Sequence, residues 1–292
     1  IESNITIKTQ NVSNDKYLKL YKIDSSLVDY NKNFLENSIN YSRTANNYFF
    51  SLDATIYETL NETYNDKYEY IYPEILYDKN LLQDEKLGIL DLQSNLKISN
   101  YDTNKHLRIL TNDFDWSSKS FNHKNGISSQ LIGKVKNVNF KTQNLSNFKE
   151  DETNEIHGAI GYLSKLELIK SVRPEKENLL TPKFLLRYAP GSMRQETGGT
   201  RLTPDRAFSL DRSEQNYNLE KGLSAAVGLD FELKDEDKKF EFSIGQIISD
   251  EENKKMGSVS SLNDKLSDLT GTTNLKIGEN LDFKYNFSLD QN

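Results

Sequence analysis

Histidine and carboxylate side chains are the residues of this sequence whose chemistry could serve catalysis or metal binding. The three histidines, His106, His123 and His157, do not stand in H-x-x-x-H or another metal-ligand spacing, so loop or polar-face positions are predicted. Asp113 and Asp115 fall on one face of a predicted strand and resemble a carboxylate pair. A polar strand face in contact with water is the simpler interpretation of this pair.

The acidic run Asp235–Asp237 offers oxygen ligands to a cation, but no glycine-punctuated calcium loop surrounds it, so a solvated turn is predicted. Cysteine is absent, which excludes disulfides, thiolate zinc sites and cysteine nucleophiles. The sequence also has no nucleophile elbow and no phosphate-binding or dinucleotide-binding glycine pattern. We therefore expect no enzyme activity, no cofactor and no metal.

Charge and composition limit the class of protein further. The net charge of -7 and the isoelectric point near 5.2 argue against a nucleic-acid partner, which normally meets a basic patch. Aromatic residues make up 11% of the 292 residues, which argues against a disordered chain. The mean hydropathy of -0.73 suggests a soluble protein, but membrane barrel strands hide their apolar half by alternation, so hydropathy does not exclude them.

The elements that carry these residues are predicted to be strands. From Gly222 to Leu233, apolar side chains alternate without interruption with small or acidic ones. The pattern stops at the charged turn Lys234–Lys239 and resumes from Phe240 to Gly245. This alternation predicts an antiparallel hairpin with one apolar and one polar face. A second hairpin is predicted from Leu35–Arg43 and Tyr48–Tyr57.

Similar alternation predicts about a dozen strands in all. The further strands are expected at Ile5–Val12, Tyr68–Tyr77, Leu90–Ile98, His106–Trp116, Gln130–Lys141, Ile156–Lys170, Leu179–Tyr188, Thr272–Ile277 and Leu281–Leu289. Long connections are expected at Asn144–Asn154, Gly191–Ala207 and Asp250–Asp268. Pro182 and Pro190 are expected to limit the ladder of the strand between them. The predicted fold class is all-β, either a partial antiparallel transmembrane β-barrel or a soluble β-sandwich.

Several short motifs occur in the order in which they occur in one known family. Val12–Leu18 resembles a V-S-D-x-x-Y-[FL] element, and Leu179–Lys183, which contains Pro182, resembles an L-x-P-[KR] strand. Phe208–Arg212 resembles an aspartate-arginine signature, with Asp211 and Arg212 in place and Ser209 where the family has glycine.

Two further motifs follow in the same order. Phe242–Ile247 resembles an S-x-G-Q-x-Y strand and contains Gly245 and Gln246, although Ile248 replaces the aromatic residue. Ser267 and Asp268 resemble an S-D motif that precedes another strand pair. Together these motifs resemble the barrel of the LptD (OstA) family of lipopolysaccharide-assembly proteins.

The resemblance implies that residues 1–292 form part of a very large barrel in the outer membrane of a Gram-negative cell. It implies that the family's N-terminal jelly-roll domain and C-terminal strands are missing from this chain. The implied function is the transport and assembly of lipopolysaccharide into the outer leaflet. The implied partners are lipopolysaccharide, membrane lipid, a plug lipoprotein of the LptE type and the periplasmic bridge proteins of the Lpt system.

Alternatives remain open at this point. Another outer-membrane barrel, such as a porin or an uptake receptor, shares the alternation, and a soluble β-sandwich binding module shares the hairpins. For Asp211 and Arg212, an ion pair or a hydrogen bond that holds the Gly191–Ala207 loop to the wall is favoured over contact with the substrate.

Overall fold

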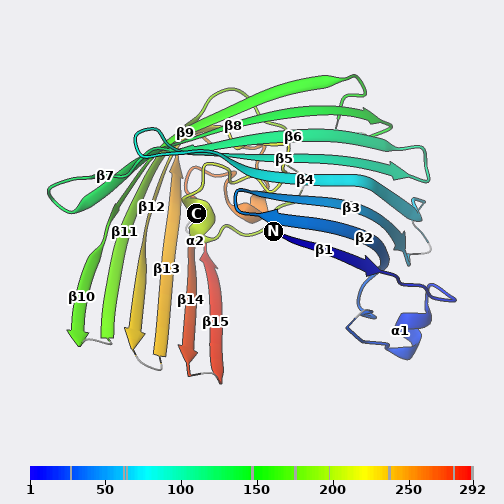
Figure 1. Cartoon of the computed structure of the whole chain (residues 1–292), viewed down its shortest axis with the longest axis horizontal. Helices are drawn as coiled ribbons and strands as arrows, with labels where there is room; N and C mark the ends of the chain where they lie inside the picture. The colour runs from blue at the N-terminus through cyan, green and yellow to red at the C-terminus, as the bar shows by residue number, and fades with distance from the viewer. Residues whose placement is uncertain are drawn as a thin grey trace. The chain divides into compact units, whose positions relative to one another are not determined.

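The chain is an all-β protein, and the part of it that the structure describes forms 15 strands of one antiparallel sheet (Figure 1). The computed structural model describes residues 1–290 except positions 27, 62, 64, 146–147, 174–175, 197, 236–237 and 279. The strands follow chain order across the sheet, from β1 at one end of the order to β15 at the other, with β7 beside β8 and β10 beside β11. The predicted all-β antiparallel class is thereby confirmed.

The chain divides into two compact units. The first comprises Ile1–Leu81, Asp91–Phe114 and Asn137–Ile156, and the second comprises Leu82–Leu90, Asp115–Lys136 and His157–Asn292.

The strands up to β8 are β1 Glu2–Lys8, β2 Phe34–Ala45, β3 Tyr48–Thr59, β4 Tyr68–Asp84, β5 Gly88–Tyr101, β6 His106–Ser117, β7 Phe121–Asn122 and β8 Ile127–Gln143. The later strands are β9 Thr153–Leu166, β10 Leu168–Arg173, β11 Lys176–Ala189, β12 Gly222–Asp235, β13 Lys238–Ser249, β14 Leu269–Ile277 and β15 Leu281–Leu289. The helices are α1 Tyr17–Tyr21, α2 Pro204–Ala207 and the 3-10 turn η1 Ser258–Ser260.

Both predicted hairpins are confirmed. β2 pairs with β3 around the turn at Asn46 and Asn47, and β12 pairs with β13. In the second hairpin the strands extend into the predicted charged turn, where Asp235 lies opposite Lys238. Glu236 and Asp237, which we expected in that turn, lie outside the described residues. No helix among the described residues is long and apolar enough to cross a membrane.

Connection lengths differ between the two ends of the strands within each unit. In the first unit, the tight turn between β2 and β3 lies at one end, and the connections 9–33 and 60–67 lie at the other. In the second unit, the junctions of β12 with β13 and of β14 with β15 are short and lie at one end of these strands, opposite the long loops 190–221 and 250–268. Long loops on one side and short turns on the other are typical of outer-membrane barrels.

The prediction that Pro182 limits the ladder is confirmed on one side of its strand only. Pairing with β9 runs from Lys183 to Tyr188, whereas on the other side β11 continues through Pro182 and pairs it with Leu229 of β12. The predicted single strand Ile156–Lys170 is wrong, since it is interrupted between β9 and β10. Both findings have one cause. β9 and β10 pair with β11 in the same register on either side of the interruption, which lies opposite Pro182. A proline has no N–H to donate, so it breaks the ladder on that side only.

The predicted strand Ile5–Val12 is also displaced. It begins at Glu2 and ends at Lys8, because the side chain of Gln10 takes over pairing with β2. Its Oε1 accepts from the backbone N–H of Glu36, and its own backbone N–H donates to Asn37 Oδ1 at 2.8 Å. The chain then leaves the sheet. The helix α1 begins at Tyr17, within the Val12–Leu18 motif, and ends at Tyr21, beyond it.

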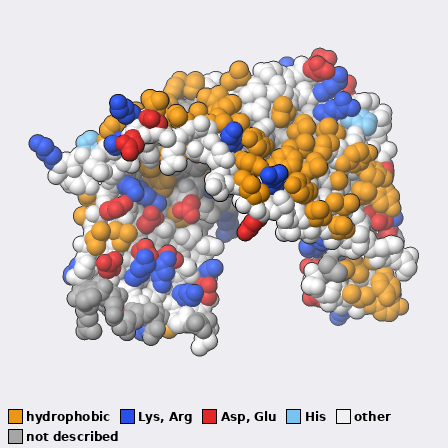
Figure 2. Space-filling model, viewed as in Figure 1, with side chains coloured by type: hydrophobic (Ala, Val, Ile, Leu, Met, Phe, Trp, Pro, Cys, Tyr) orange, Lys and Arg blue, Asp and Glu red, His pale blue; other side chains and the backbone are white. Residues whose placement is uncertain are grey.

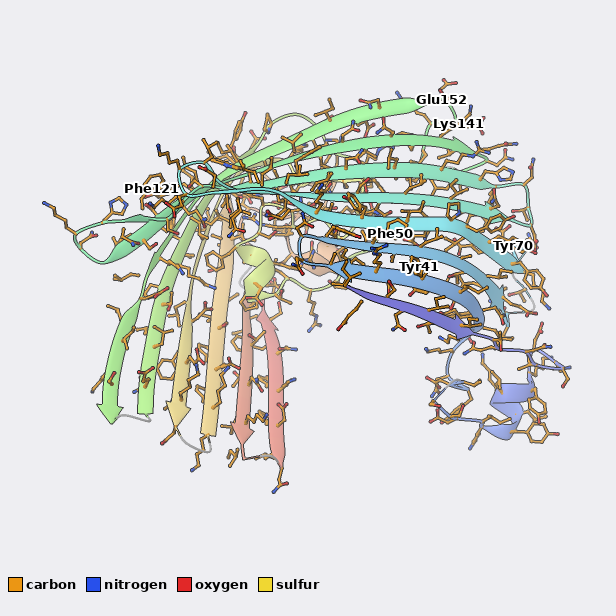
Figure 3. The ribbon with its side chains drawn as sticks, viewed as in Figure 1. Tyr41, Phe50, Tyr70, Phe121, Lys141 and Glu152 are labelled. Carbon is orange, nitrogen blue, oxygen red and sulfur yellow. The ribbon has the colours of Figure 1, made fainter. Side chains whose placement is uncertain are left out.

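The two faces of the sheet differ in polarity within each unit. In the first unit, Ile5, Ile39 and Leu52 are exposed on one face, where the rings of Tyr41 and Phe50 lie 6.3 Å apart (Figure 3). The opposite face of β2 and β3 is polar and carries side-chain hydrogen bonds between Asn40, Ser51 and Asp53. A broad hydrophobic patch over β2–β5 is visible in Figure 2.

The second unit shows the same division. Its apolar face exposes large side chains at alternate positions, namely Ile160 and Tyr162 on β9, Phe184, Leu186 and Tyr188 on β11, and Leu223 and Val227 on β12. Its polar face carries ion pairs across strands, such as Lys183–Asp230 at 2.6 Å, and along a strand, such as Lys239–Glu241 at 2.5 Å. The two long loops fold onto this polar face. They enclose a core of Met193, Leu202, Ala207, Met256 and Leu262 against Leu185, Ala226 and Ile247 of the strands.

Candidate functional site

The loop 190–221 is fixed to the polar face of the second unit by buried charged side chains. Arg187 on β11 is fully buried, and it donates from Nε to the carbonyl of Leu210 at 2.8 Å and from Nη2 to that of Glu220 at 2.6 Å. Arg212 in the loop is also fully buried, and its Nη1 donates to the Glu220 carboxylate at 3.3 and 3.4 Å and to Ser224 Oγ at 3.1 Å. We call Arg187, Arg212 and Glu220 the arginine cluster.

A second ion pair joins the loop to β8. Lys136 is almost completely buried, and its Nζ lies 2.8 Å from Asp211 Oδ2 and donates to the carbonyl of Asn216 at 2.7 Å. Inside the loop, Asn218 is fully buried and exchanges two hydrogen bonds of 3.1 Å with the backbone of Arg194. Backbone groups of a long loop are thus satisfied by side chains rather than by a sheet ladder.

The helix α2 rests on a strand glycine. Thr203 caps the helix by accepting from the N–H of Arg206, and Pro204 occupies its first turn. A Cβ at Gly245 of β13 would lie 3.3 Å from Ala207 Cβ and 3.4 Å from Pro204 Cα. The absence of a side chain at Gly245 therefore permits the close approach of α2 to the sheet.

Burial shifts the pKa values of loop groups. Burial lowers the pKa of Arg212 to about 10, with Glu220 opposing the shift and the positive charge of Arg187 adding to it. Burial, together with the charge of Arg187, lowers the pKa of Lys221 to about 8. Burial raises the pKa of Glu196, whose carboxylate accepts a hydrogen bond from Ser213. The loop therefore brings more positive charge to the arginine cluster than the cluster's one carboxylate can neutralise.

The structure separates the residues singled out in the sequence into three places. Asp211 and Arg212 lie in the loop, and Pro182 lies apart from them in β11. The remaining four gather where β13 meets the start of β14. Gln246 Nε2 donates to the carbonyl of Ser267 at 2.9 Å, Ser267 Oγ accepts from the N–H of Ile247, and Asp268 accepts from Ser288.

Sequence reasoning missed Lys136, Arg187 and Glu220 as partners of the loop. The sequence did contain a signal for Lys136 and Arg187. Each is a long cationic side chain at a position that side-chain alternation assigns to the polar face of its strand. Glu220 gave no signal, since its role depends on the path of the loop. Among the described residues, no three His, Cys, Asp or Glu side chains gather as metal ligands.

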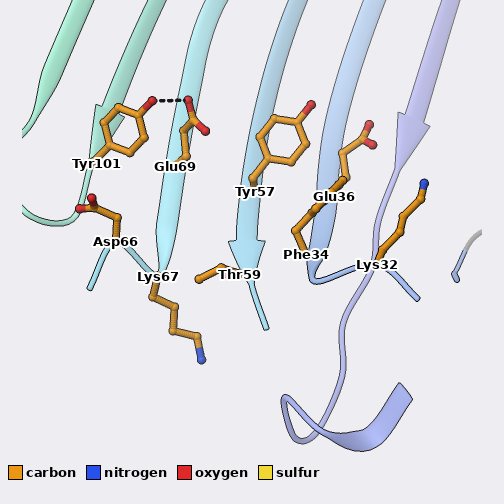
Figure 4. Close-up of a pocket in the computed structure, with 9 residues that line it drawn as sticks. All are labelled: Lys32, Phe34, Glu36, Tyr57, Thr59, Asp66, Lys67, Glu69 and Tyr101. Carbon is orange, nitrogen blue, oxygen red and sulfur yellow. Dashed lines mark hydrogen bonds between the residues drawn. The ribbon is translucent and has the colours of Figure 1, made fainter. Parts of the chain in front are cut away.

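A pocket of about 440 Å³ lies in the first unit, at the loop-side ends of β2 to β5 (Figure 4). Part of its wall is a row of side chains directly across neighbouring strands: Glu36, Tyr57, Glu69 and Tyr101. Tyr57 is the register partner of both Glu36 and Glu69, and Tyr101 Oη donates to Glu69 Oε1 at 2.8 Å. Carboxylates and phenols therefore alternate along the row.

Comparison with known proteins adds no family to these observations: no protein-family model matches the chain, and a search of curated proteins found no match.

Proposed function

We propose that this chain is part of the wall of an outer-membrane β-barrel that moves lipopolysaccharide into the outer leaflet. One observation carries the membrane part of the proposal. In the second unit, the face covered by the protein's own loops is the polar one, and the face left exposed is the apolar one. A soluble β-sandwich buries its apolar faces against each other, whereas a barrel in lipid turns them outward.

The polar face supports the transport part of the proposal. It carries paired charges and hydroxyl or amide groups, such as Lys183 with Asp230 and Asn40 with Asp53, which suit the passage of hydrated sugar. The exposed apolar side chains of the opposite face suit contact with acyl chains. The resemblance of the ordered motifs to the LptD family favours lipopolysaccharide over other amphiphiles. A plug lipoprotein and periplasmic bridge proteins are the partners that this resemblance implies.

Spin labels at single introduced cysteines test the membrane part, because the sequence contains no cysteine of its own. Val227→Cys places a label on the exposed apolar face, and Ser243→Cys places one on the polar face. In lipid vesicles we expect the first label to be accessible to oxygen dissolved in lipid and the second to a water-soluble nickel complex. A stable, lipid-free monomer in which the label at position 227 is shielded from both reagents, while the label at position 243 meets the nickel complex, would establish the soluble sandwich instead.

Depletion of the intact protein in cells tests the transport part. We expect lipopolysaccharide to disappear from the cell surface and to accumulate inside the envelope. Unchanged surface lipopolysaccharide, combined with steady ion conductance of the reconstituted protein, would contradict the proposal and establish a porin-like channel.

A further inference from the structure

The pocket of the first unit has the form of a site for a small polar ligand. Its volume of about 440 Å³ falls within the range of roughly 300–1,000 Å³ that is typical of small-ligand pockets. All of its lining residues belong to the first unit, and they come from β2 to β5 and the connections beside them. Figure 4 shows the side chains of Glu36, Tyr57, Glu69 and Tyr101 standing next to one another along the row.

Aromatic rings form the apolar part of this pocket. The ring of Phe34 meets the ring of Tyr57 edge to face, with centroids 5.7 Å apart and an interplanar angle of 83°. Lys32 Nζ lies 5.9 Å from the centroid of the Phe34 ring. Phe34 is 43% exposed, so its ring offers an apolar surface to a ligand that enters the pocket.

Three charged groups of the pocket, Glu36, Asp66 and Lys67, are ion-paired within the protein. The other two, Lys32 and Glu69, leave one charge of each sign with no ion pair among the described residues. Lys8 Nζ binds Glu36 at 2.8 Å, and Lys105 Nζ lies 2.5 Å from Asp66. Lys67 lies 3.4 Å from both Asp15 and Glu58. A ligand with a full charge would have to compete with these pairs, whereas an uncharged ligand can use the remaining lone pairs and hydroxyl groups.

We propose that this pocket binds a short neutral saccharide. A pyranose ring has an apolar C–H face that can lie on Phe34 or Tyr57, and its hydroxyl groups can donate to Glu69 and exchange hydrogen bonds with the Tyr57 hydroxyl. Glu69 is held in place by Tyr101, so the acceptor is oriented before the sugar arrives. The proposal goes beyond membrane transport and can be tested without it, because a free saccharide serves as the ligand.

The test is isothermal titration of the full chain in a detergent without a sugar headgroup, such as lauryldimethylamine oxide. The probes are maltotriose, lactose and tri-N-acetylchitotriose, with glucosamine as a cationic and glucose 6-phosphate as an anionic comparison. We expect at least one neutral saccharide to saturate the protein. We expect Tyr57→Phe and Glu69→Gln each to weaken its binding by about fivefold to tenfold, the loss of one hydrogen bond.

Tyr41→Phe is the matched control, because Tyr41 lies on the opposite face of β2. Like Tyr57→Phe, this change removes one phenolic hydroxyl group, but it should leave the affinity for the saccharide unchanged. Tyr57→Phe decides the outcome if Glu69→Gln fails to fold, as circular dichroism would reveal. The proposal is overturned if no neutral probe binds more tightly than about 10 mM. It is also overturned if a charged probe binds best, if Tyr57→Phe binds like the wild type, or if Tyr41→Phe loses as much affinity.

Discussion

At Arg212, a guanidinium that retains its charge at neutral pH is buried beside a second one, and both depend on the carboxylate of Glu220. The Nη1 atom of Arg187 lies 3.9 Å from that carboxylate, so Arg212 supplies the closer contacts. Among the described residues, Nε and Nη2 of Arg212 and Nη1 of Arg187 find no hydrogen-bond partner. Burying two guanidinium groups with one carboxylate costs free energy, and the packing of the loop 190–221 against the sheet must offset that cost.

Arg212→Ala should release the loop 190–221 from the sheet. Removing one partner of a buried ion pair costs about 3–5 kcal/mol, because the remaining charge is left without compensation. We expect faster proteolysis within the loop and lower delivery of lipopolysaccharide by the intact protein. Arg201→Ala, at an exposed residue of the same loop, is the control and should change neither. Unchanged delivery together with unchanged loop proteolysis would contradict a role for Arg212 in holding the loop.

The closed state of the loop should become more stable as pH rises from about 8 to 10.5. The pKa of Lys221 is near 8 in the folded protein and 10.5 in its ordinary state, so between these values the open state binds more protons. Closure of the loop is therefore penalised below the folded pKa, and the penalty is removed as pH rises. Loop proteolysis relative to a Lys221→Met variant, compared at each pH, measures the effect. A ratio that does not change with pH would contradict it.

At the scale of elements, larger residues at position 245 test the packing of α2 against β13. Gly245→Ala places its Cβ in tight contact with Ala207 and Pro204, and Gly245→Val adds γ-carbons for which α2 leaves no room. We expect the valine variant to expose the loop to protease strongly and the alanine variant to do so slightly. The cooperative loss of β-structure on heating should change less. Equal protection of the loop in both variants would contradict the proposed contact.

How far elements can be predicted from sequence depends on whether their causes are local. The β2–β3 and β12–β13 hairpins were predictable because side-chain alternation and turn residues lie within one stretch of chain. The division of β9 from β10 was not, since its cause, Pro182, belongs to the neighbouring strand. The arginine cluster was predictable in part: Arg212 belongs to a motif and alternation places Arg187 on the polar face of β11, but the position of Glu220 depends on the path of the loop.

At the scale of the molecule, the order of strands among the described residues ends at β1, which pairs with β2, and at β15, which pairs with β14. A free strand edge presents unpaired N–H and C=O groups to other chains. We expect the isolated chain in detergent to associate through these edges. Thr6→Cys on β1 or Asn286→Cys on β15 should give disulfide-linked dimers on oxidation. Asn40→Cys, on the internal strand β2, is the control and should not. Equal cross-linking of all three variants would contradict edge pairing.

The contacts of the loop 190–221 also determine when it can take its final position. Its groups bind Lys136 on β8, Arg187 on β11 and Gly245 on β13, and the contact between Lys136 and Asn216 spans 80 residues. None of these contacts can form until the strands that carry them have been assembled side by side. Closure of the loop is therefore a late event in biogenesis, and a protease that cuts only the open loop would distinguish half-assembled molecules from finished ones.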